Sequence, residues 1–261
     1  MNTVDKSPPE TVSVDKPPVP RASMADIWRV PVAVWRARRA LDRGDLRAAR
    51  TLVAPLLGTF GSVTFIRKLA AEILYASGDP LSAASLFEQA AKRLPNDRAV
   101  AVGLVASYAA LNRAGDARRS AALLPEQVDV RLALAWAELV ALGGDRDRGT
   151  ALVAAIANDA DLARSAERVA MHRALEAIAA ARSHDRDSVR AKLRAAEVDA
   201  PKLRAGDRAF LGYLGGVALR EAGLVDDAHA TFALAMDASP DSIGSALARR
   251  ERANLDGTRP L

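Results

Sequence analysis

The fold is decided by a stretch of sequence that occurs twice. Residues 78–95 read GDPLSAASLFEQAAKRLP, and residues 223–240 read GLVDDAHATFALAMDASP. In both, the glycine is followed by Ala, Phe, Ala and Pro at positions +5, +9, +12 and +17. A glycine in the left-handed conformation ends one helix, and small residues at helical spacing let a second helix pack closely on the first. The stretch therefore predicts the turn and second helix of an antiparallel helical hairpin.

Pairs of glycine and aspartate extend this pattern along the chain. They occur at residues 44–45, 78–79, 115–116 and 144–145. The first interval is 34 residues and the last two together make 66, so the pairs indicate an internal repeat. Each aspartate can accept hydrogen bonds from the free N–H groups that open the next helix. We therefore predict about six helical hairpins, with a final helix near residues 241–254 that caps the last hydrophobic face.

These residues resemble the second helix and the terminal proline of the tetratricopeptide repeat. Full matches cover residues 64–97 and 209–242, within a resemblance that spans about residues 30–242. The resemblance implies an all-α, right-handed α-solenoid with a concave groove, which is lined by the first helix of each hairpin and binds a segment of another protein. Chaperone-binding members of the family grip a carboxylate with Lys and Asn. Here Glu72 stands four residues after Lys68, so that clamp is not expected.

Nine side chains fall at the groove-facing positions when each first helix is aligned on its turn. They are Arg38, Lys68, Glu72, Tyr75, Asn112, Arg113, Glu138, Tyr213 and Arg220. On the resemblance, these are the candidate contacts of a bound peptide or helix of another protein. The alternative is that each of them is solvated or packed against a neighbouring turn.

The composition agrees with a helical fold. Among 261 residues, 57 are alanine, 4% are aromatic and none is cysteine. This makeup disfavours an all-β sandwich or barrel, and it excludes disulfides and thiolate chemistry. Residues 1–23 are rich in proline and have no apolar period, which predicts a disordered tail. The helical repeat domain is then expected to cover residues 24–261.

Positive charge is concentrated near the N-terminus. The net charge of +5 equals the excess of seven arginines over two aspartates between residues 29 and 50. On a helix, Trp28 and Trp35 would form an apolar stripe beside a basic one. The basic-patch candidates are Arg29, Arg36, Arg39, Arg43 and Arg47. Such a surface suits nucleic-acid phosphates or an anionic membrane. Alternatively, the segment is only the first helix of the first hairpin, with its tryptophans packed on the next unit.

Nothing in the sequence indicates catalysis, and we predict a protein that is not an enzyme. The histidines at positions 172, 184 and 229 lack metal-ligand spacing, and no glycine-rich phosphate loop is expected after a strand. Neither a cofactor nor a metal ion is expected. The chain has no apolar run of membrane-spanning length and no secretory signal, which favours a cytoplasmic protein. The predicted function is that of an adaptor or scaffold, with nucleic-acid or anionic-surface binding as the alternative and a helical enzyme as the third interpretation.

Overall fold

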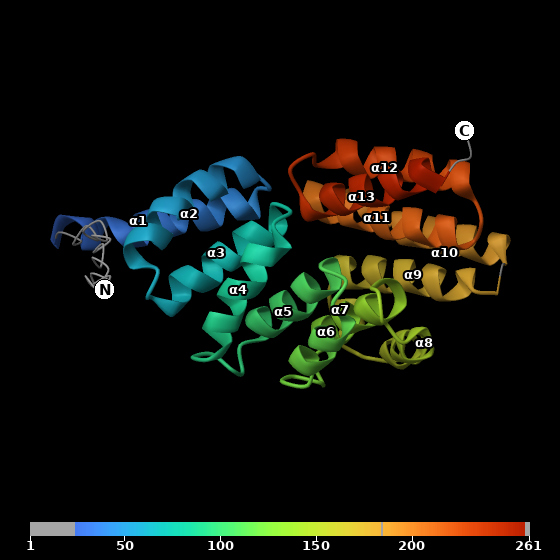
Figure 1. The fold of residues 1–261 in the computed structure, drawn as a ribbon, viewed down its shortest axis with the longest axis horizontal. Coiled ribbons are helices and arrows are strands. Elements are labelled where there is room, and N and C mark those ends of the chain that lie inside the picture. The colour runs from blue at the N-terminus through green and yellow to red at the C-terminus, as the bar shows by residue number, and fades with distance from the viewer. Residues whose placement is uncertain (1–23, 184, 259–261) are drawn as a thin grey trace, which may run out of the picture.

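The structure is a computed structural model that describes residues 24–183 and 185–258 (Figure 1). The predicted tail at residues 1–23 lies outside the described residues. Thirteen α-helices and two short 3₁₀ helices make up most of the described part of the chain, and no strand occurs in that part. The all-α prediction is confirmed.

Consecutive helices pack as neighbouring pairs. The first three pairs are α1 (Met24–Asp42) with α2 (Leu46–Phe60), α3 (Thr64–Ala76) with α4 (Pro80–Ala91), and α5 (Arg98–Ala110) with α6 (Ala114–Ala121). The next three are α7 (Val128–Val140) with α8 (Arg146–Ile156), α9 (Ala166–Ala181) with α10 (Arg186–Glu197), and α11 (Ala205–Glu221) with α12 (Val225–Ala238). The final helix, α13 (Ile243–Thr258), packs against both α11 and α12, as expected of a capping helix.

Two of the predicted turns are confirmed in detail. Gly44 and Gly78 have φ angles of 77° and 79°, the left-handed region that favours glycine. The carboxylates of Asp45 and Asp79 then accept hydrogen bonds from backbone N–H groups in the first turn of α2 and α4. These short-range contacts end one helix and begin the next, so they follow directly from the local sequence.

The other two predicted turns were placed in the wrong register. Gly115 lies inside α6, and the left-handed residue of this turn is Asn112, with a φ of 59°. Asparagine adopts this conformation more readily than most other side chains, and Asn112 stands 34 residues after Gly78. In the fourth turn the left-handed residue is Gly143 rather than Gly144.

The phenylalanines at position +9 of the repeated stretch are both buried. Phe87 and Phe232 are 1% and 0% exposed. The ring of Phe87 lies against Gly103 of α5, and the ring of Phe232 lies against Gly216 of α11, so closely that an added Cβ on either glycine would be 2.3 Å from the ring. A side chain at either glycine would push the helices apart.

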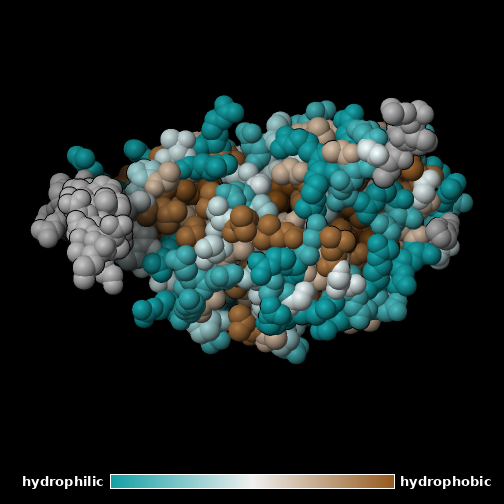
Figure 2. All heavy atoms as spheres, in the orientation of Figure 1, coloured by the Kyte–Doolittle hydropathy of each residue, from teal (hydrophilic) through white to brown (hydrophobic). Residues whose placement is uncertain are grey.

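The array curves until its last helices meet its first ones (Figure 1). The α3–α4 turn touches α13, since an added Cβ on Gly78 would lie 3.1 Å from the Cβ of Ala246. Arg250 of α13 donates a 2.9 Å hydrogen bond to the carbonyl of Ala110 at the end of α5. In Figure 2, apolar side chains gather over the N-terminal helices and in the middle of the face, between the N-terminal and C-terminal helices. The array therefore closes upon itself.

Candidate functional site

The curved array partly surrounds a cavity of about 570 Å³ that is open to solvent on one side. Its wall comes mainly from one helix of each pair, namely α3, α5, α7, α9 and α11, with α1 and the start of α13 at its edge. Ligand pockets typically measure about 300–1,000 Å³. The cavity is therefore large enough for several side chains or for a small molecule.

Aromatic side chains form part of the cavity wall. Trp136 of α7 and Phe210 of α11 line the cavity, with their ring centroids 4.9 Å apart in an edge-to-face arrangement. Tyr213 stands behind them, 6.3 Å from Trp136 between centroids and fully buried. Tyr75 and Met171 also line the cavity. This wall offers apolar surface that an apolar ligand can cover.

Most charged groups of the wall are paired within the protein. The guanidinium of Arg168 binds both carboxylate oxygens of Asp129, at 2.6 and 3.0 Å, and Arg98 pairs with the same carboxylate. Arg38 of α1 pairs with Glu72 of α3. Burial raises the pKa of Glu72, and the charges of Arg38 and Lys68 oppose that rise. These pairs leave little free charge on their side of the cavity.

Two carboxylates of the wall differ from the others. Among the described residues, no cation lies within ion-pair distance of Glu167 at the start of α9 or of Asp207 at the start of α11. Burial raises the pKa of both groups, and the negative charges of Asp207 and Asp129 raise the pKa of Glu167 further. The charge of Arg204 opposes both rises, and a hydrogen bond from the backbone N–H of Arg204 also opposes the rise at Asp207. Glu167 is exposed to the cavity while protein surrounds it. The two carboxylates therefore form a negative site that the protein itself neutralises only in part.

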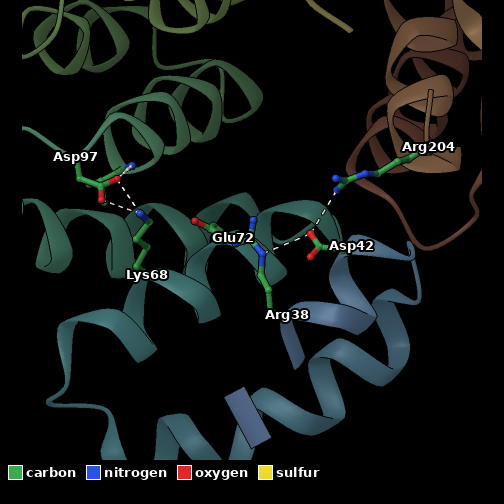
Figure 3. A network of polar contacts seen from close by, with 7 residues as sticks. Arg38, Asp42, Lys68, Glu72, Asp97 and Arg204 are labelled. Atoms are coloured by element: carbon green, nitrogen blue, oxygen red, sulfur yellow. Dashed lines mark hydrogen bonds and ion pairs between the residues drawn. The ribbon is translucent and has the colours of Figure 1, made fainter. Parts of the chain in front are cut away.

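A chain of ion pairs joins the two ends of the array beside the cavity (Figure 3). Arg38 contacts Asp42 at 3.4 Å as well as Glu72, and Arg204, just before α11, reaches Asp42 at 3.7 Å. Residues 42 and 204 are far apart in sequence, so this contact exists only because the array closes. Exposed pairs of this kind contribute little stability, and their main effect is to orient the side chains.

Three of the nine predicted groove residues line the cavity, namely Arg38, Glu72 and Tyr75. Burial raises the pKa of the Tyr75 phenol. Lys68 lies outside the cavity wall and pairs with both oxygens of Asp97, at 2.7 and 2.9 Å. Although burial opposes it, the hydrogen bonds from Lys68 and from a backbone N–H lower the pKa of Asp97.

For two residues the predicted groove position was wrong. Glu138 and Tyr213 are both 0% exposed, so neither offers a surface to a partner. Glu138 was aligned on Gly144 although the turn is at Gly143, and a shift of one residue turns a helical side chain by about 100°. Tyr213 packs on Trp136 within the array.

The remaining three predicted groove residues lie near the turns, away from the cavity. Asn112 forms the α5–α6 turn, and Arg113 pairs with Asp116 at 2.5 Å. Arg220 pairs with Glu221 and Glu251. The alignment on the turns assumed that every first helix faces the groove at the same distance from its turn. In α11, however, the N-terminal half lines the cavity, and Arg220 lies near the other end. No interaction with a partner is assigned to these three residues.

Sequence reasoning missed the side chains that give the cavity its chemistry. They are Trp136, Glu167, Met171, Asp207 and Phe210. The apolar period around Trp136 shows that this residue is buried, but it does not show whether the buried stripe faces another helix or a cavity. That distinction depends on the curvature of the array.

The basic patch is divided between two places. Arg29, Arg36 and Arg39 of α1 and Arg43 of the α1–α2 turn are exposed, whereas the guanidinium of Arg47 in α2 lies 3.9 Å from the carboxylate of Asp241, close to α13. Trp35 is 55% exposed, so residues of the next unit cover at most part of its side chain. The side chain of Trp28 lies outside the part of the chain that the structure describes.

The described residues contain no group of three His, Cys, Asp or Glu side chains placed to hold a metal ion. Within the same residues, no helix has the length and apolar character needed to cross a membrane. The ring of His172 is buried, with its Nε2 atom 2.9 Å from the carbonyl of Val153, and His184 lies outside the described residues. His172 thus has a packing role.

Comparisons of the chain with family models, with curated proteins and with solved structures gave no match. The cavity and the exposed basic side chains of α1 are the two features of the described residues that bear on function.

Proposed function

We propose that the chain is a tetratricopeptide-like, right-handed α-solenoid of six hairpins that acts as a non-enzymatic protein-interaction module, an adaptor or scaffold. The six neighbouring helix pairs and the capping position of α13 support this proposal. The left-handed turn residues Gly44, Gly78 and Asn112 follow one another at 34 residues, the length of a tetratricopeptide unit. Later units are longer or shorter, so the resemblance is strongest in the first half of the chain.

The observation that carries the proposal is the cavity. The first helices of five pairs surround one space of about 570 Å³ instead of filling it with their own side chains. Its aromatic and aliphatic wall gains free energy when a ligand displaces water from it. The space is partly open to solvent, and its volume suits a few side chains or a chain end.

The charges of the wall indicate the chemistry of the bound segment. Glu167 and Asp207 repel each other and lack an ion-pair partner among the described residues, so a positive group placed between them would relieve that repulsion. Phe210, which is half-buried in the same wall, can attract a cation to its ring face and an alkyl chain to its surface, while Trp136 is 1% exposed and supports it from behind. The partner segment is therefore a short one that carries a lysine, an arginine or an amino terminus beside apolar residues.

The experiment is a selection of random displayed peptides on the full chain, followed by affinity measurements. Ala99 of α5 lines the cavity and is exposed, so Ala99→Trp occupies part of the cavity, whereas Ala191→Trp adds the same side chain on the exposed surface of α10. Selected peptides should be enriched in basic and apolar residues, and Ala99→Trp should weaken their binding by about tenfold or more while Ala191→Trp has no effect.

Replacing Glu167 and Asp207 tests the chemistry of the site separately. Glu167→Gln with Asp207→Asn keeps the shape of the wall and removes its negative charge, so binding of basic peptides should fall by about tenfold or more. Peptides that bind both the wild type and Ala99→Trp equally well would contradict the proposal, as would a selection that yields no cavity-dependent binder.

A further inference from the structure

The outward face of α1 combines basic and apolar side chains. Helical spacing places Val32 and Trp35 on the same side as four arginines, and these two apolar side chains are 51% and 55% exposed. The arginines are Arg29, Arg36, Arg39 and Arg43, all exposed. We call this surface, together with the hollow described next, the α1 face. An exposed tryptophan among arginines is unusual for a helix that only closes the end of an array.

A shallow hollow adjoins Trp35 between α1 and the start of α3. Val63, just before α3, and Phe65 in its first turn line the hollow and are 45% and 57% exposed, and the surface of the hollow is almost entirely apolar. Figure 2 shows apolar side chains gathered at this end of the molecule. A neighbouring group of exposed apolar residues marks an interaction surface more strongly than scattered ones.

The arginines of the α1 face have no carboxylate partner among the described residues. Arg39 instead lies over the ring of Trp35, with its guanidinium carbon 5.0 Å from the ring centroid. Arginines elsewhere on the surface do pair, for example Arg146 with Glu221 at 3.0 Å and Arg190 with Asp227 at 2.7 Å. The positive charge of the α1 face is therefore available to an anionic partner.

We propose that the α1 face docks on an anionic lipid bilayer. Guanidinium groups bind phosphate oxygens, and tryptophan is suited to the boundary between headgroups and acyl chains. A bilayer surface can satisfy both halves of the α1 face at once, because it offers negative headgroups above an apolar interior. Nucleic acid also offers phosphates, but it would leave Val32, Val63 and the hollow in contact with water. The apolar half of the α1 face therefore favours lipid.

The first arm of the test measures binding of the full chain to vesicles by flotation. Vesicles of three parts phosphatidylcholine to one part phosphatidylglycerol should bind the chain, and pure phosphatidylcholine vesicles should not. Arg36→Glu, Arg39→Glu and Arg43→Glu in one variant should weaken binding by about a hundredfold, since each basic residue near such a surface contributes roughly fivefold. The matched control reverses Lys92, Arg93 and Arg194, exposed cations of other hairpins, and should keep its binding.

The second arm tests the apolar half of the α1 face. Trp35→Ser with Phe65→Ser leaves the charge unchanged and should lower vesicle affinity by about tenfold or more. Circular dichroism melting of every variant shows whether it is folded, and all substituted side chains are exposed. Binding of a duplex or single-stranded oligonucleotide without binding to the anionic vesicles would overturn the proposal. So would equal losses in the two charge-reversal variants, or vesicle binding that ignores the serine substitutions.

The α1 face and the cavity can be tested independently. Ala99→Trp occupies part of the cavity without touching the α1 face, so it should retain full vesicle binding. Loss of peptide binding with retained vesicle binding, or the reverse, separates a failure of the cavity proposal from a failure of the lipid proposal.

Discussion

Helix pairs α3/α4 and α7/α8 are joined by similar turns but are held together by different side chains. In both, an aspartate caps the second helix, and the residue eight positions further on is buried. That residue is Phe87 in α4 and Val153 in α8. The smaller side chain leaves α7/α8 with a weaker apolar contact between its helices.

A buried ion pair compensates in α7/α8. Glu138 of α7 accepts two hydrogen bonds from Arg118 of α6, both 2.6 Å long, and a third of 2.8 Å from the backbone N–H of Asp145. This one carboxylate therefore links α6, α7 and the start of α8. The difference teaches that a repeat unit can lose its apolar signature and keep its fold, provided that a polar contact from a neighbouring unit replaces it.

The largest expected effect is the loss of the apolar contact in α4. Phe87→Ala should lower the free energy of unfolding by about 3–5 kcal/mol, because it removes a buried ring and leaves a cavity against Gly103. Val153→Ala removes far less volume and should cost about 1–2 kcal/mol. Urea denaturation of both variants checks this difference. Equal costs would show that the apolar contact does not distinguish the two pairs.

Removal of the Glu138 carboxylate should destabilise the chain slightly less than Phe87→Ala does. Glu138→Ala leaves Arg118 and the N–H of Asp145 without their acceptor, and we expect a loss of about 3 kcal/mol in the free energy of unfolding. The value lies at the low end for buried pairs because the side chain of Arg118 is 32% exposed and can be hydrated. Glu126→Ala, on the exposed α6–α7 turn, is the control and should be neutral. A neutral Glu138→Ala would refute the compensating role of the ion pair.

A smaller difference in stability is expected between glycine substitutions in the α3–α4 turn and in the α7–α8 turn. Gly78 and Gly143 both have positive φ, so replacement by alanine should cost about 1 kcal/mol at each. At Gly143 an added Cβ meets nothing within 4 Å, whereas at Gly78 it lies 3.1 Å from the Cβ of Ala246. Gly78→Ala should therefore cost more than Gly143→Ala in thermal melting, and adding Ala246→Gly should remove the excess. If the two single variants melt alike, α13 is not tightly packed on the α3–α4 turn.

The smallest effect concerns Glu167 and Asp207. Unlike Glu138, which pairs with Arg118, they have no ion-pair partner among the described residues. The raised pKa values of Glu167 and Asp207 mean that the folded chain binds protons more tightly than the unfolded chain. Stability should therefore fall as the pH rises from the ordinary values of 4.5 and 3.8 through the raised ones. Glu167→Gln with Asp207→Asn should flatten this profile and raise the melting temperature at neutral pH. Glu126→Gln is the exposed control, and an unchanged profile in the double variant would contradict this prediction.

The sequence by itself determined the helical class, several helix boundaries and the apolar contacts within hairpins. Gly44, Gly78 and Gly223 are left-handed as predicted, and Phe87 and Phe232 are buried. These features depend on neighbours within a few residues, where capping, the sign of φ and the helical period act. Local physics was therefore sufficient to predict them. The turn at Asn112 was missed because the prediction relied on Gly followed by Asp.

The closure of the array and the chemistry of its cavity were decided only by the tertiary structure. Tyr75 and Tyr213 were both predicted to face a groove, yet Tyr75 lines the cavity and Tyr213 is fully buried behind Trp136. Their environments differ because Tyr213 packs on Trp136 and Phe210 within the array. The contacts that bring α13 against the α3–α4 turn and α5 join residues more than a hundred positions apart. Small changes of angle between successive pairs add up along the array, and no local pattern encodes that sum.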